Sequence, residues 1–383
     1  MLVYFSFIAV LLLLSTLKGR KVGTFLAILV SFFFVGLRYE TGFDWPVYKG
    51  IFESLGENYS WEIILFQSLI RSHEVTFVAF LGSIAQILPS YEYVQAIFTL
   101  FFLLSFFRLA NAIPGSRPVL ALAVFFSFYL ASIGFSTVRQ TLAISLFNWG
   151  LASYLRGGRW SAYVFMTLAA MSQFSSLLYF AGFLVSRSSM SSRLFKPIPY
   201  SFFSLMFMLS LPFLIELIAM AVPFVESKIA FYRGLAFSSY FGIMTTGMLI
   251  LVYLIGLMTA YLLKRQSNAP DGLPIEFLCL ISALSAIAVG SFFFSVLRER
   301  ISYEVLLLFS IFLSTRFVKS RITVAAAIIG FGLIVQTKLY FQDPFDLAFV
   351  PYQNGVALWL TGSESTGEAR SQLYLDIFSE QFR

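Results

Sequence analysis

The stretch VLALAVFFSFYLASIG, residues 119–134, carries no charged side chain and is long enough to form most of a membrane span. Basic Arg117 precedes it, and only three residues separate it from a second apolar run, VRQTLAISLFNWGLASYL, residues 138–155. Because lipid offers the backbone no hydrogen-bond partner, such runs cross a membrane as helices. This pair of runs therefore predicts neighbouring transmembrane helices.

The composition extends this prediction to the whole chain. Of the 383 residues, 59% are hydrophobic and 12% are charged, and the mean hydropathy is +0.84. A soluble globule of this size cannot bury so much apolar surface. We therefore predict an all-α polytopic integral membrane protein in one domain, residues 1–383, with about eleven transmembrane helices plus short re-entrant or interfacial helices.

The distribution of basic residues gives an orientation, because lysine and arginine concentrate in cytoplasmic loops. Lys18, Arg20 and Lys21 follow the first apolar run and place that link inside the cell. Alternating the spans from there predicts an external loop over 38–91, including a segment at 76–88 that is too short to span. It also predicts paired short helices over 160–186 that turn near 172–176, and an external C-terminal tail over 341–383.

Several kinds of chemistry are excluded by residue counts. The single cysteine, Cys279, cannot form a disulfide within the chain or a thiolate metal site, and the single histidine, His73, cannot build a histidine-rich metal centre. We expect no cofactor, no metal and no nucleic acid partner. The net charge of +7 fits basic loops against anionic lipid.

Arginines on the external side need a different reason, since cations are normally kept inside. The predicted topology places six arginines there, which are Arg38, Arg71, Arg139, Arg233, Arg298 and Arg300. An anionic ligand such as a phosphate explains them together. The alternative for each one is snorkelling or pairing with a carboxylate, as Glu299 would provide between Arg298 and Arg300.

Arg139 opens its apolar run at Val138-Arg139-Gln140. An arginine and the free amides of a helix N-terminus act on an anion with the same sign. This position predicts an anion site.

The external segment RYETGFDWPVY, residues 38–48, combines carboxylates, a glycine turn and aromatic rings. Carboxylates accept hydrogen bonds from sugar hydroxyls and aromatic faces stack on pyranose rings, so the segment indicates a sugar site. Asp44 and Tyr48 would share one helical face. The alternative is an amphipathic helix on the membrane surface that Asp44 caps.

These residues and their order resemble the EpsG family of Wzy-like polysaccharide polymerases. The resemblance rests on Arg38, Gly42, Asp44 and Tyr48, on Glu74 before Thr76-Phe77, on Arg139-Gln140 with Ala143, on Arg300 with Tyr303, and on the ending Pro351 to Asn354. One departure is Gln173, in Gln173-Phe174-Ser175, where the family usually carries a histidine. Glutamine cannot act as a general base.

The resemblance implies a GT-C-type architecture shared by Wzy polymerases and O-antigen ligases. It implies a membrane glycosyltransferase that polymerises polyprenyl-diphosphate-linked oligosaccharide repeat units at the periplasmic face of the bacterial inner membrane. Its other partners would be membrane lipid and a chain-length regulator. The catalytic candidates it implies are Asp44, Glu74, Arg139, Arg298 and Arg300.

The arginines would stabilise the departing diphosphate and a carboxylate would deprotonate the acceptor, with Asp44 or Glu74 ahead of Glu40. Substrate-binding candidates are Arg38, Glu40, Tyr48, Gln140, Gln173, Tyr303 and Tyr352. An O-antigen ligase remains an alternative of the same chemical class, and a lipid-linked sugar transporter or flippase is one of another class. The stretch Gly362 to Arg370 indicates a flexible tail without identifiable chemistry.

Overall fold

The computed structural model describes most of the chain. The described residues are 1–57, 59–69, 74–191, 206, 210, 213, 246–256, 258, 275–291, 295–315, 320–341 and 345–381. Three candidate residues, Arg71, His73 and Arg233, lie outside this set, as do most of the apolar run over 199–217 and part of the run over 242–263.

All regular secondary structure in these residues is helical, apart from one isolated antiparallel bridge between Arg38 and Asn354. The longer helices are α1 (Leu2–Ser15), α2 (Arg20–Ser31), α6 (Tyr91–Ala112), α7 (Pro118–Tyr129), α8 (Val138–Leu155), α9 (Arg159–Ser172), α10 (Ser176–Ser191), α14 (Ile275–Gly290), α15 (Ser295–Leu313) and α16 (Arg321–Tyr340). The all-α prediction is confirmed for the part of the chain that the structure describes.

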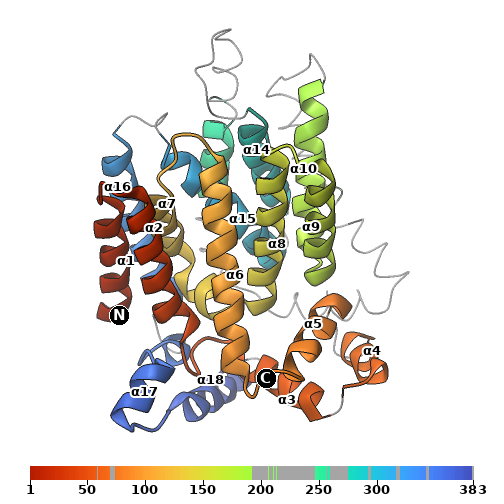
Figure 1. Ribbon diagram of the computed structural model, residues 1–383, viewed down its shortest axis with the longest axis vertical. Coiled ribbons are helices and arrows are strands. Elements are labelled where there is room, and N and C mark those ends of the chain that lie inside the picture. Colours follow the sequence, from red (N-terminus) through yellow and green to blue (C-terminus); the bar gives the residue numbers. More distant parts are fainter. Residues whose placement is uncertain are drawn as a thin grey trace.

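A second group of helices covers one end of this bundle (Figure 1). It comprises α3 (Trp45–Glu57), α4 (Trp61–Leu69), α5 (Val75–Ala85), η3 (Phe345–Ala348), α17 (Gly355–Thr361) and α18 (Gly367–Gln381). These helices come from the predicted external loop and the predicted external tail, two segments far apart in sequence. Figure 1 shows α3 and α18 next to each other at this end of the molecule.

Three helices among the described residues are long and apolar enough to cross a membrane. They are Tyr91–Ala112, Pro118–Ser136 and Arg321–Lys338, and shorter apolar helices such as Leu2–Ser15 and Glu276–Gly290 accompany them. These helices support an integral membrane protein, while the number of eleven spans stays a prediction.

The centre of the bundle is α7. Every residue from Pro118 to Ser136 is buried, and α7 packs against α1, α15 and α16. A helix that is apolar on all sides needs partners all round, so this burial follows from the sequence of residues 119–134.

Two π-helical turns lead into the site region, η1 (Phe32–Gly36) after α2 and η2 (Leu130–Ser136) after α7. Such turns are rare in proteins, and those that occur are often found at functional sites. The backbone after η1 is fixed to the C-terminal tail, since Tyr39 N donates to Gln353 O at 3.0 Å and Gly355 N donates to Leu37 O at 2.9 Å.

Gly42 is the tightest point of this connection. Its φ of +111° is strained for any other residue, and an added Cβ would stand 2.3 Å from the carbonyl oxygen of Phe135 in η2. We expect Gly42→Ala to displace the segment carrying Asp44 and to lower the thermal unfolding temperature of the purified protein in detergent. Gly330→Ala in α16, where a Cβ meets open space, is the matched control, and an unchanged unfolding temperature in Gly42→Ala would contradict the expectation.

Candidate functional site

Arg139 lies in the first turn of α8 and joins two other segments. Its Nε donates to the hydroxyl of Tyr48 on α3 at 2.6 Å, and its Nη1 donates to Glu74 Oε2 at 2.5 Å. The guanidinium carbon also stands 5.7 Å from the centre of the Tyr48 ring. Arg139 is therefore held from two sides at a helix N-terminus.

Glu74 precedes α5 and links Arg139 to the turn between α9 and α10. Its Oε1 accepts a hydrogen bond from Phe174 N at 3.3 Å, while its Oε2 pairs with Arg139. Both carboxylate oxygens are thus used within the protein, and the carboxylate and guanidinium are both largely buried.

Asp44 lies directly before α3 and is half-buried. Burial raises the pKa of Asp44 to about 6, while the positive charges of Arg139 and Arg300 oppose this rise. Arg139 at the start of α8 and Arg300 on α15 are therefore both near enough to this carboxyl to act on its charge. A pKa near neutrality is suited to a general base.

The hydroxyl of Tyr48 lies beside Asp44 and Arg139. Burial raises the pKa of Tyr48 to about 12, so the hydroxyl keeps its proton at neutral pH. It accepts a hydrogen bond from Arg139 Nε and so holds this guanidinium at the start of α8.

Gln140, the residue after Arg139, connects three helices. Its Nε2 donates to the hydroxyl of Tyr179 on α10, and its Oε1 accepts from Ser175 Oγ at 3.2 Å. The Tyr179 hydroxyl in turn donates to the carbonyl oxygen of Arg300 at 2.5 Å. This chain of hydrogen bonds fixes the start of α15 relative to α8.

Arg298 and Arg300 lie two residues apart on α15, where side chains do not face each other. Both arginines act on Glu299, which lies between them in the chain. Arg300 also acts on Asp44 and Tyr48, whereas Arg298, only 4% exposed, also acts on Tyr129. That the two arginines hold one anion together stays a prediction.

Glu299 and Tyr303 are paired inside α15. Tyr303 donates to Glu299 Oε1 at 2.7 Å, and Tyr340 donates to the same oxygen at 3.4 Å. The Tyr303 ring packs edge-on against Tyr129 with centroids 4.6 Å apart. The hydroxyl of Tyr303 is thus engaged within the protein.

Arg38, which follows η1, is buried and only 4% exposed. Its Nη1 donates to Val35 O at 2.8 Å and its guanidinium stands 5.7 Å from the Phe135 ring centre. Its Nε has no hydrogen-bond partner among the described residues. Burial lowers the pKa of Arg38 to about 10, so it stays charged at neutral pH.

Gln173 directly follows α9 and is 2% exposed. Its Oε1 has no hydrogen-bond partner in the described part of the chain. The neighbouring Phe174 amide holds Glu74, so Gln173 belongs to the same turn that supports Arg139. Tyr352, by contrast, uses its hydroxyl on Phe34 O at 2.5 Å and stacks on the Phe34 ring at 4.6 Å.

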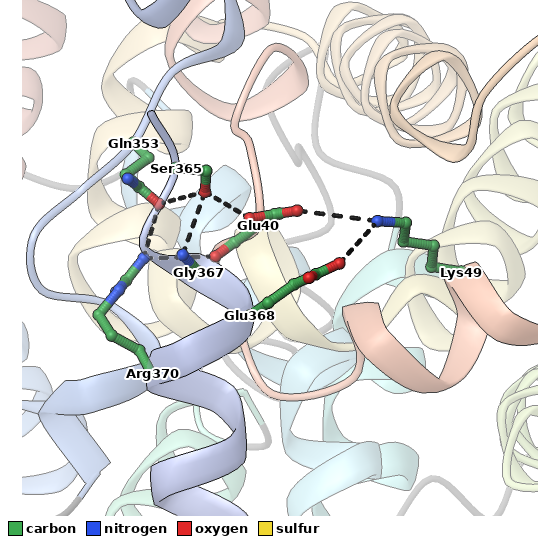
Figure 2. A network of polar contacts seen from close by, with 7 residues as sticks. All are labelled: Glu40, Lys49, Gln353, Ser365, Gly367, Glu368 and Arg370. Carbon is green, nitrogen blue, oxygen red and sulfur yellow. Dashed lines mark hydrogen bonds and ion pairs between the residues drawn. The ribbon is translucent and has the colours of Figure 1, made fainter. Parts of the chain in front are cut away.

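Glu40 is the centre of a polar network with the C-terminal tail (Figure 2). Its carboxylate accepts from Ser365 Oγ and lies 3.7 Å from Lys49 Nζ, which is also 3.2 Å from Glu368. Arg370 donates to Gln353 Oε1 at 2.9 Å and to Leu347 O at 2.9 Å. The prediction that residues 362–370 form a flexible tail is therefore wrong. Helix α18 begins at Gly367, and these contacts fix its first turn to the segment that carries Glu40.

The structure thus brings together Asp44, Tyr48, Glu74, Arg139 and Arg300, and it places Arg38, Glu40 and Tyr352 in the adjoining contact with the tail. Sequence reasoning missed Tyr179 and the tail residues Ser365, Glu368 and Arg370. The only sequence signal for the tail was a serine and an acidic residue around Gly367, which is too common to be diagnostic. Among the described residues, no three His, Cys, Asp or Glu side chains form a group that could hold a metal ion.

A double-mutant cycle tests whether Glu74 and Arg139 form one unit. Removing either charge leaves the other buried and unpaired, so Glu74→Gln and Arg139→Gln should each destabilise the protein, and the double variant should lose less than their sum by about 2 kcal/mol. Reversible unfolding in detergent micelles measures this coupling. Additive losses would mean that the ion pair contributes nothing.

The family model described as the EpsG family matches residues 21–354. No curated protein and no solved structure matches the chain. The matched residues include the whole cluster around Arg139, while α18 lies beyond them.

Proposed function

The chain belongs to the EpsG family, whose members are Wzy-like polysaccharide polymerases, and we propose that it joins polyprenyl-diphosphate-linked repeat units at the periplasmic face of the bacterial inner membrane. The proposal includes about eleven spans in a GT-C-type arrangement and one domain over residues 1–383. The helices over 38–91 and the tail over 341–383 would then face the periplasm.

The observation that carries the proposal is a half-buried carboxyl, Asp44, on which the charges of both Arg139 and Arg300 act. In the reaction, the acceptor hydroxyl attacks the anomeric carbon of the donor. A new carbon–oxygen bond forms, the bond from that carbon to the diphosphate breaks, and the hydroxyl proton must be accepted. A carboxylate base suits the acceptance of the proton, and two nearby cations suit the stabilisation of the departing diphosphate.

We assign the base to Asp44. Glu74 is the other sequence candidate, but its two oxygens are engaged by Arg139 and by Phe174 N. Glu40 is engaged by Ser365 and Lys49. Asp44, with a pKa raised to about 6, can hold the transferred proton and release it near neutral pH.

The departing diphosphate would be stabilised by guanidinium groups, without a metal ion. Arg139 contributes through the helix N-terminus on which it stands, and Arg300 contributes from α15. Arg38 and Arg298 would add positive potential from buried positions. The Tyr48 hydroxyl would position the Arg139 guanidinium for this role, since it accepts a hydrogen bond from Arg139 Nε.

Gln173 takes a binding role in this assignment. Its buried Oε1, which lacks a partner among the described residues, would accept a hydrogen bond from a sugar hydroxyl. Gln140 then holds Tyr179 and Ser175 in place, and Tyr303 and Tyr352 act as packing supports.

Reconstitution tests the function directly. Purified protein in liposomes, supplied only with polyprenyl-diphosphate-linked repeat units from the same cells, should yield a ladder of longer lipid-linked glycans and free polyprenyl diphosphate. No ladder, with transfer of single units to added lipid A core, would indicate a ligase instead. Movement of the substrate across the bilayer without a new glycosidic bond would indicate a flippase.

A further inference from the structure

A cleft of about 590 Å³ lies between α3 and α18, lined from both helices by polar and charged side chains. We propose that this cleft binds sugar residues of the acceptor glycan and that α18 is the wall that makes the binding selective. The proposal rests on the proposed polymerase function and adds a saccharide site to it.

The lining chemistry matches a saccharide. Glu53 and Glu368 supply carboxylate acceptors, Gln372 supplies an amide with both donor and acceptor, and the partly exposed Pro46 supplies an apolar ring. The volume falls within the range of small-molecule sites in proteins. Sugars combine hydroxyl groups with apolar ring faces, and this lining offers partners for both.

The charges argue against an anionic ligand. Among the described residues that line the cleft, Lys49 is the only cation, and it already pairs with Glu40 and Glu368. With Glu53 added, the lining carries an excess of negative charge. A lipid tail is equally unsuited, and an apolar hollow of about 320 Å³ elsewhere, lined by residues such as Phe125, Leu306 and Phe331, fits one better.

The cleft lies next to the candidate base. Trp45 lines it and follows Asp44 directly in the chain. Beyond the lining, Tyr374 of α18 packs against Phe43 with ring centroids 5.2 Å apart, so α18 also contacts the residue before Asp44. The cleft therefore borders the segment that carries Asp44.

The α18 wall is fixed before any ligand binds. Gly367 packs so closely on Glu40 that an added Cβ would stand 2.2 Å from the Glu40 Cβ. Arg370 and Ser365 tie the same stretch to Gln353. A preformed wall lowers the ordering cost of binding, and because α18 lies beyond residues 21–354, this wall belongs to the part of the chain that the family model does not cover.

Filling the cleft from each wall separately tests the proposal. Ala369→Trp fills it from α18 and Gly50→Tyr fills it from α3, where a Cβ at Gly50 meets open space. Leu373→Trp, at an exposed position of α18 outside the lining, is the matched control. The probe is the free oligosaccharide of one repeat unit, released by mild acid from the lipid-linked substrate and titrated onto purified protein.

We expect the probe to bind the parent and the Leu373→Trp variant equally, and to bind both filled variants at least about tenfold more weakly. In the liposome assay the filled variants should show a raised KM for the acceptor with kcat nearly unchanged. Parent-like binding in both filled variants, or no binding to the parent, would overturn the cleft assignment. If the parent forms no polymer but the cleft still binds the probe, the saccharide site stands and the polymerase proposal fails.

Discussion

Asp44→Asn is expected to lower the polymerisation rate by at least about 100-fold, because the amide is isosteric but cannot accept the acceptor's proton. The protein should still fold and still bind the lipid-linked substrate, since Arg139 keeps its contacts with Tyr48 and Glu74. Rates in the liposome assay, normalised to membrane protein, measure the loss.

The pH profile of the parent protein gives a second reading of the same residue. With a pKa raised to about 6, Asp44 is the required free base above that pH and is protonated below it. Activity should therefore fall on the acid side, by about tenfold for each pH unit below the pKa. The charged groups that act on Asp44 are Arg139 and Arg300, and its charge also reaches the phenols of Tyr48 and Tyr374, which stay neutral in this range.

Glu57→Gln, at the exposed last residue of α3, is the control for loss of a carboxylate elsewhere in this part of the chain. An Asp44→Asn variant with parent-like rates would remove Asp44 from the reaction. If Glu74→Gln then lost activity without losing stability, Glu74 would take over the role of the base.

Helices that depend on local pattern alone were predictable. The run over 138–155 becomes α8 with the same bounds, because an uncharged link precedes it and Gly157 and Gly158 follow it. Pro118 at the first position of α7 is an equally local signal. The π-helical turns at Phe32–Gly36 and Leu130–Ser136 were not predictable, since they are set by packing between α1, α7 and the tail.

In the candidate site, too, some residues could be predicted from the sequence and others could not. Arg139 could be selected from sequence because a charge at the start of an apolar helix requires a partner. Its partners could not, because Tyr48 and Glu74 are 91 and 65 residues away along the chain. The docking of α18 depends on Gly367 fitting against Glu40, a contact between distant residues that composition cannot reveal. Composition alone indicated flexibility there.

Arg300→Ala is expected to cost at least about 100-fold in polymerisation rate, and Arg298→Ala less, although the two residues look equivalent in sequence. The reason is helical geometry. Both arginines act on Glu299, but Arg300 also acts on Asp44 and Tyr48, at the proposed reaction centre, whereas Arg298 acts on Tyr129. Arg159→Ala, which removes an exposed arginine at the start of α9, controls for the change in net charge.

The charge of Arg300 should also affect the pH at which activity falls on the acid side of the pH profile, here called the acid limb. The position of this limb distinguishes an electrostatic role of Arg300 from a structural one. The charge of Arg300 lowers the pKa of Asp44, so its removal must raise that pKa and move the acid limb of the residual activity to higher pH. Arg300→Lys keeps the charge and should leave the limb close to its original position, even if the rate falls because a lysine cannot make two parallel hydrogen bonds to a phosphate. An unchanged limb in Arg300→Ala would show that Asp44 is not the titrating base, whereas equal losses in Arg298→Ala and Arg300→Ala would favour a joint contribution of both arginines to the diphosphate site.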